Sequence, residues 1–148
     1  MKELRGAAGA TVDAPIERCF ELLRAVDAYP SWYPEVVKSV QVVERGAEGE
    51  PARVQTILHL AQGPLARDFD LLMTVTAQRP TTVDLSRVPH GRSDDERFQV
   101  VWRLTRQSGT RIDLELRANL SVPRFVPLGG IGDSVAQGFV TAAVRQLS

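Results

Sequence analysis

Residues 12–37 read VDAPIERCFELLRAVDAYPSWYPEVV, and this stretch contains the change of periodicity that decides the fold. Its first half repeats apolar residues with the spacing of one helix face: Ile16, Cys19, Phe20, Leu23 and Val26. Pro15 suits the first turn of this helix, because its missing N–H has no partner there in any case. We therefore expect an amphipathic helix from about residue 15, capped by Asp13 or Ala14.

Aromatic residues and prolines crowd the second half of the same stretch. Tyr29, Trp32 and Tyr33 are interspersed with Pro30 and Pro34 over six positions, and they include both tyrosines of the chain. Proline disfavours helical conformation in the residue before it, so a short second helix should end here. Three roles fit this segment: a structural corner, a wall of a ligand cavity, or an exposed knob that docks on a partner. We expect a corner first and a wall second.

Beyond residue 37 the apolar period falls to two, which predicts strands with one apolar and one charged face. The alternation recurs over residues 40–42, 54–60, 69–75, 83–85, 98–104 and 112–120. For the last two runs the register can be predicted, since both apolar faces must lie on one side of the sheet. A loop at residues 107–109, with Gly109 in a left-handed conformation, places Trp102 opposite Leu114.

A second helical pattern follows Gly130, with Asp133 or Ser134 as its expected cap, and a short edge strand is expected at residues 7–13. The predicted order is one strand, two short helices, the remaining strands and a long C-terminal helix. This order indicates a single α+β domain over residues 1–148, with a curved antiparallel sheet of six to seven strands wrapped around the last helix. One helix rarely covers such a sheet completely, so an internal apolar cavity is expected.

Composition excludes several classes of protein. Eighteen basic residues balance eighteen acidic ones, so the electrostatic attraction that drives nucleic-acid binding is weak and no nucleic-acid partner is expected. The single Cys19 excludes an internal disulfide and a cysteine-cluster metal site. Without a long apolar run or a signal-peptide pattern, a cytoplasmic location is expected. We expect no metal and no cofactor.

Residues 12–46 resemble the opening of the START-like, helix-grip superfamily, also called SRPBCC or Bet v 1-like. The resemblance is to the group of polyketide cyclases/dehydrases and coenzyme Q-binding proteins. The motifs that carry it are Ala14-Pro15, Phe20, Tyr29-Pro30, Trp32-Tyr33-Pro34 and a valine-rich strand that ends at Glu44. The resemblance implies a helix-grip fold around a cavity for a hydrophobic molecule. It does not specify one activity, because members of a fold host different functions.

Strand parity, helix faces and the corner together predict the residues that line this cavity. The set is Trp32, Tyr33, Thr56, Leu58, Phe69, Leu71, Met73, Leu85, Val100, Trp102, Leu114, Leu116, Val135 and Phe139. For any single one of them ordinary core is the better explanation, whereas the set as a whole is expected to line the cavity. Gly138 is expected to leave space beside Phe139, and the Trp102 indole N–H can serve either a ligand oxygen or a backbone carbonyl.

Three functions follow from these observations. The leading hypothesis is a binding protein that transports or sequesters a lipid, an isoprenoid quinone or a polyketide-like aromatic. The alternative is a polyketide aromatase/cyclase, for which the resemblance implies a tyrosine and an arginine in the cavity, with Tyr33 and Arg67 as the nearest candidates. The third is an accessory protein that docks through Trp32 and Tyr33, or contacts a membrane surface transiently through residues 125–128. The oligomeric state is not determined by the sequence.

The remaining polar residues are not expected to form a catalytic or metal site. His59 and His90 are expected to be exposed and to have no orienting partner, and they lie too far apart for a metal set. Residues 94–96, Asp-Asp-Glu, are expected to form a solvated loop.

Overall fold

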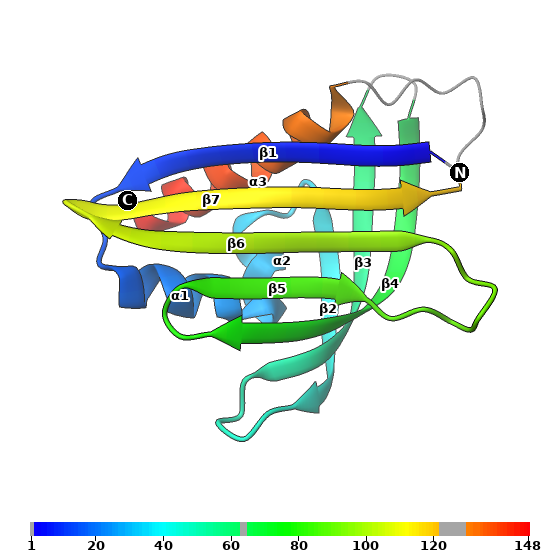
Figure 1. The fold of residues 1–148 in the computed structure, drawn as a ribbon, viewed down its shortest axis with the longest axis horizontal. Helices are drawn as coiled ribbons and strands as arrows, with labels where there is room; N and C mark the ends of the chain where they lie inside the picture. The colour runs from blue at the N-terminus through cyan, green and yellow to red at the C-terminus, as the bar shows by residue number, and fades with distance from the viewer. Residues whose placement is uncertain (1, 63–64, 122–129) are drawn as a thin grey trace.

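The computed structural model describes residues 2–62, 65–121 and 130–148, and it consists of one sheet, two short helices with a 3-10 turn, and one long helix (Figure 1). The elements follow in the order β1 (Lys2–Val12), α1 (Ile16–Arg24), η1 (Val26–Ala28), α2 (Tyr29–Trp32), β2 (Val37–Arg45), β3 (Pro51–Gln62), β4 (Leu65–Gln78), β5 (Thr82–Arg87), β6 (Arg97–Gln107), β7 (Gly109–Leu120) and α3 (Ile131–Leu147). The predicted α+β helix-grip fold is confirmed. The expected contact loop at residues 125–128 lies outside the described residues.

The seven strands form one antiparallel sheet in the order β1-β7-β6-β5-β4-β3-β2. Figure 1 shows β2, β3 and β4 crossing the direction of β1, β7 and β6, so the sheet is strongly curved, and α3 runs along β1 and β7. We call the side that faces α3 the inner face. β1 is an edge strand as predicted, although it is longer than the expected residues 7–13.

The β6–β7 hairpin has the predicted register, with Trp102 opposite Leu114. Its turn is tighter than expected, because Ser108 alone separates the paired residues Gln107 and Gly109. Gly109 has φ of +142°, and a Cβ built there would lie 2.1 Å from the carbonyl oxygen of Val12. Only glycine fits both the conformation and the contact.

The start of α3 lies directly on the backbone of β1. A Cβ at Gly6 would lie 2.0 Å from the Gly132 carbonyl oxygen, so this contact requires glycine. The Asp133 carboxylate accepts a hydrogen bond from the Ala7 backbone N–H at 3.0 Å, which occupies a donor on an otherwise open sheet edge.

Both helix caps differ from the expectation. Gly130 is the N-cap of α3, with φ of +80°, so Asp133 and Ser134 lie inside the first turn. Pro15 occupies the N-cap position of α1 in place of Asp13 or Ala14, because the chain stays extended through the proline. Neither cap residue forms a side-chain capping bond.

The inner face of the sheet, α3 and the corner at residues 29–33 form the core. All fourteen side chains of the predicted set are buried. Trp32 and Tyr33 are only 6% and 7% exposed, which agrees with the expected corner and does not support the alternative of an exposed knob. Tyr29 anchors the corner by donating from its hydroxyl to the Leu23 carbonyl at 2.6 Å.

Candidate functional site

A small apolar cavity lies between the inner face, the corner and α3. It is lined by Val26, Tyr29, Val37, Val40, Thr56, Leu58, Met73, Leu85, Phe98, Val100 and Phe139. Its volume is about 20 Å³, which is room for about one water molecule. The predicted cavity is therefore present at the expected place, but side chains fill most of it.

The predicted set and this lining overlap in part. The shared residues are Thr56, Leu58, Met73, Leu85, Val100 and Phe139. The predicted residues that are buried around the cavity without lining it are Trp32, Tyr33, Phe69, Leu71, Trp102, Leu114, Leu116 and Val135. The lining residues that the prediction missed are Val26, Tyr29, Val37, Val40 and Phe98. Phe98 has the same parity as Val100, so strand periodicity alone could have found it.

Two hydroxyl groups are the only polar side-chain groups in the described lining, and both donate to backbone. Thr56 Oγ1 donates to the Leu71 carbonyl at 2.9 Å, and Tyr29 Oη donates to the Leu23 carbonyl. Burial raises the pKa of Tyr29, so its hydroxyl stays neutral. The lining residues that the structure describes thus include no charged group and no free acid or base.

Tyr33 fills the space that Gly138 leaves on α3. A Cβ built at Gly138 would lie 2.1 Å from Tyr33 Oη. The Tyr33 ring also meets Phe139 edge-on, with ring centroids 4.7 Å apart. Burial, reinforced by the negative charge of Glu35, raises the pKa of Tyr33 to about 12, so this hydroxyl is neutral too. The expected space beside Phe139 exists, and the Tyr33 side chain occupies it.

Both indole N–H groups lack a hydrogen-bond partner. Trp32 Nε1 and Trp102 Nε1 are the buried side-chain polar atoms without a partner in the described part of the chain. The Trp102 side chain lies beside the Tyr29 hydroxyl and opposes the rise in the pKa of Tyr29, but the two groups do not meet hydrogen-bond geometry.

Arg67, the second candidate of the cyclase hypothesis, lies at one end of the sheet. It pairs with Leu60 and so belongs to the inner face, as its parity predicted, but it is exposed. Its guanidinium donates to the Ser121 carbonyl and lies 4.8 Å from the ring centre of Phe69. No described contact joins it to Tyr33, so the structure does not bring the two candidates together.

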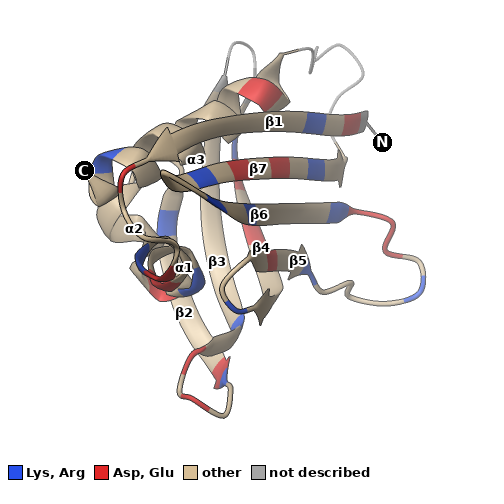
Figure 2. Cartoon of the chain, turned by 60° about the vertical axis from the view of Figure 1, so that its left-hand side comes forward, with Lys and Arg blue, Asp and Glu red and all other residues tan. Residues whose placement is uncertain are grey.

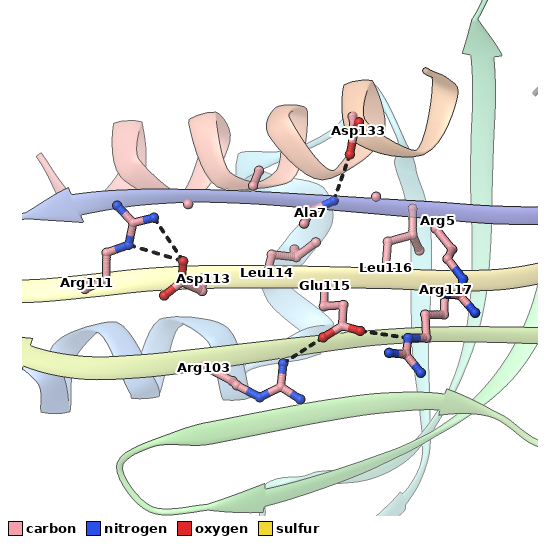
Figure 3. A pocket seen from close by; sticks show the side chains of 13 residues that line it. Arg5, Ala7, Arg103, Arg111, Asp113, Leu114, Glu115, Leu116, Arg117 and Asp133 are labelled. Carbon is pink, nitrogen blue, oxygen red and sulfur yellow. Dashed lines mark hydrogen bonds and ion pairs between the residues drawn. The ribbon is translucent and has the colours of Figure 1, made fainter. Parts of the chain in front are cut away.

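A wider and more open hollow lies on the outer face of β1, β7 and β6, with a volume of about 720 Å³; Figure 3 shows the side chains that line it. Charged residues of both signs follow these strands (Figure 2). Glu115 pairs with Arg103 and Arg117, and Arg111 pairs with Asp113. Exposed ion pairs of this kind contribute little energy. Because the hollow is polar and open, it does not suit the apolar ligand that the inner face suits.

Two expectations about polar residues are wrong. His59 has a partner, since its Nδ1 lies 2.6 Å from an Asp68 carboxylate oxygen across β3 and β4. Asp94 is not simply solvated, because its carboxylate lies 2.7 Å from the guanidinium of the nearly buried Arg87. That hydrogen bond, and a second one from the His90 backbone N–H, hold the pKa of Asp94 well below its usual range.

No group of three or more His, Cys, Asp or Glu residues in the described ranges is arranged to hold a metal ion. No helix within them is long and apolar enough to cross a membrane.

Comparison of structures finds the same fold in proteins of low sequence identity. A START superfamily protein from Mycobacterium smegmatis is 15% identical, with a TM-score of 0.78 over 97% of this chain and 96% of that chain. The protein TTHA0849 from Thermus thermophilus is 18% identical, with a TM-score of 0.69 over 99% of this chain and 97% of that chain. The di-domain ARO/CYC BexL, from the BE-7585A biosynthetic pathway, is 11% identical, with a TM-score of 0.67 over 99% of this chain and 50% of that chain.

Comparison of sequences identifies the family. No curated protein matches the chain. The family model described as polyketide cyclase / dehydrase and lipid transport matches residues 12–145, which is nearly the whole chain. The chain therefore belongs to the polyketide cyclase/dehydrase and lipid transport family.

Proposed function

We propose that this protein binds a hydrophobic small molecule, such as a lipid, an isoprenoid quinone or a polyketide-like aromatic, between the inner face of the sheet and α3. The observation that carries this proposal is the lining of the cavity, which combines apolar side chains with two neutral hydroxyls. Burying such a surface under a ligand favours binding by roughly 25 cal/mol of free energy for each Å² of apolar area removed from water. Family membership supports the same class of ligand.

A ligand must displace side chains before it can bind. Sites for small molecules usually measure roughly 300–1,000 Å³, far more than the cavity of about 20 Å³ seen here. Tyr33 is the side chain best suited to move. Its hydroxyl makes no hydrogen bond in the described structure, whereas Tyr29 is held by the Leu23 carbonyl. Outward rotation of Tyr33 would expose Gly138 and free one side of the Phe139 ring.

Binding fits the geometry better than cyclisation does. A cyclase needs acid–base groups placed at the reacting atoms. Tyr29 and Thr56 use their hydroxyl protons on backbone carbonyls, and the raised pKa of Tyr33 leaves it a weak acid at neutral pH. Arg67 is committed to the Ser121 carbonyl at the end of the sheet. These contacts support binding as the function of the described site.

The test combines native mass spectrometry of gently purified protein with titration of N-phenyl-1-naphthylamine, a neutral fluorescent probe. We expect a co-purified apolar molecule or saturable probe binding, and tighter binding to Tyr33→Ala, which removes the side chain packed against Phe139 and Gly138. Ile57→Ala is the matched control, because Ile57 is an exposed apolar residue on the outer face next to Leu58. If neither the wild type nor Tyr33→Ala binds the probe, and no ligand co-purifies, the proposal is refuted.

A further inference from the structure

The two unpaired indole N–H groups indicate which hydrogen-bonding group the ligand has. Trp102 is fully buried, and Trp32 is nearly so. Buried polar groups in proteins are almost always hydrogen-bonded, so an unpaired buried donor needs an explanation. An indole N–H can only donate, so the missing partner must be an acceptor.

Both indoles pack against residues that line the cavity. The Trp102 ring meets Phe139 edge-on at a centroid distance of 6.2 Å, and its N–H lies beside the Tyr29 hydroxyl. The Trp32 ring contacts the Tyr29 ring at 4.7 Å. Tyr29 and Phe139 both line the cavity. Each indole is therefore separated from the cavity by one layer of side chains.

Phe139 lines the cavity and contacts both Tyr33, which fills the space beside it, and Trp102, which carries one of the unpaired indole N–H groups. Its ring meets both the Tyr33 ring and the Trp102 ring edge-on. A ligand that displaces Tyr33 removes the side chain against which Phe139 rests. Rotation of Phe139 would then extend the enlarged cavity toward the Trp102 N–H.

We infer that the ligand is a neutral apolar molecule with a hydrogen-bond acceptor, such as a ketone, ester or quinone carbonyl oxygen, which accepts from one of the two indole N–H groups. This inference rests on the proposed function and narrows its ligand class. The described lining has no cationic side chain, so a carboxylate or phosphate would lose its hydration without compensation. A molecule without an acceptor would leave both indole donors unpaired.

The test uses three naphthalenes of nearly the same shape: 2-acetylnaphthalene, 2-isopropylnaphthalene and 2-naphthoate. The chain contains only two tryptophans, so a ¹⁵N-labelled sample gives two indole N–H signals, which Trp32→Phe and Trp102→Phe assign. We expect 2-acetylnaphthalene to move one indole proton downfield while 2-isopropylnaphthalene does not. Comparing the two compounds removes the ring-current shift that they share. We expect 2-naphthoate to bind more weakly than either neutral compound.

Binding constants provide a second measurement. In the variant that lacks the responding indole N–H, the preference for the acetyl over the isopropyl compound should fall about two- to tenfold, the range for one hydrogen bond. If both compounds bind but move the indole protons equally, or if 2-naphthoate binds most tightly, this inference is refuted while the proposed function stands. If none of the compounds binds to the wild type or to Tyr33→Ala, the proposed function fails and this inference fails with it. The measurements on the wild type do not depend on the stability of the tryptophan variants.

Discussion

Gly138→Ala is the substitution that most directly tests how the cavity is closed. In the structure the Tyr33 hydroxyl oxygen would lie 2.1 Å from the new Cβ, and the ring carbon that bears it would lie 3.1 Å away. Real Cβ atoms essentially never approach another heavy atom within 3.0 Å. The Tyr33 ring must therefore shift by about 1 Å or leave the space beside Gly138.

The net effect on stability combines two opposite terms. Alanine favours the interior of a helix over glycine by ~1 kcal/mol. Overpacking against Tyr33 costs about 1–3 kcal/mol. We therefore expect Gly138→Ala to be neutral or to lower the free energy of unfolding by up to about 2 kcal/mol. In Tyr33→Phe the clashing oxygen is absent and the nearest ring carbon lies 3.1 Å from the new Cβ, so the same glycine substitution should cost less than it does in the wild type.

Urea unfolding of the four proteins in this double-mutant cycle gives the coupling between the two sites. We expect a coupling energy of about 1–3 kcal/mol, and tighter binding of N-phenyl-1-naphthylamine to Gly138→Ala because Tyr33 is displaced. If Gly138→Ala stabilises the wild type by ~1 kcal/mol and the two substitutions are additive, Tyr33 does not lie against Gly138. The account of a closed cavity would then be wrong.

Three further predictions concern the scaffold and its ionisable groups. Gly132→Ala forces a Cβ onto the backbone of β1 and should lower the free energy of unfolding by about 2 kcal/mol or more. The control Gly91→Ala has open space around the new Cβ and should be nearly neutral. Equal urea midpoints for the two variants would contradict the close contact between Gly132 and β1. The lowered pKa of Asp94 means that its contribution to stability is present above its unfolded pKa near 3.9 and is lost as the pH falls toward its folded value. Asp94→Asn should therefore flatten the decline of the melting temperature between about pH 5 and pH 2, and an unchanged decline would refute the assignment. Both tyrosines are buried with raised pKa values, so tyrosinate absorbance at 295 nm should not appear near pH 10 while the protein is folded. The stability that Tyr33 contributes as a neutral group should decline between pH 10 and about pH 12, and a titration with a midpoint at pH 10 in the folded protein would contradict its burial.

Periodicity predicted much of this fold, because the sheet has one apolar and one charged face along most of its length. The register of β6 and β7 could be worked out in advance, since strict alternation and a glycine turn leave few alternatives. The helix caps could not be predicted from the sequence, because Gly130 and Pro15 act through backbone conformation and not through a capping side chain.

The cavity itself could be predicted only in outline. Parity shows which side chains point inward, but the borders of the remaining space depend on how α3 and the corner are placed. The contact between Tyr33 and Gly138 joins residues more than a hundred positions apart, so no local pattern encodes it. Asp94 and Arg87 are only seven residues apart, but their pairing depends on the conformation of the loop after β5, and a run of acidic residues gives no sign of it.

We expect a neutral apolar ligand to bind on the inner face of the sheet, against α3. The most direct measurement is two-dimensional NMR of the labelled protein during titration with 2-acetylnaphthalene, with the methyl signals assigned. We expect saturable shifts at the lining residues Leu58, Leu85 and Val100, with little change at the outer-face residues Ile57 and Val43. Shifts confined to the outer face, or no saturable shift in either the wild type or Tyr33→Ala, would contradict this expectation.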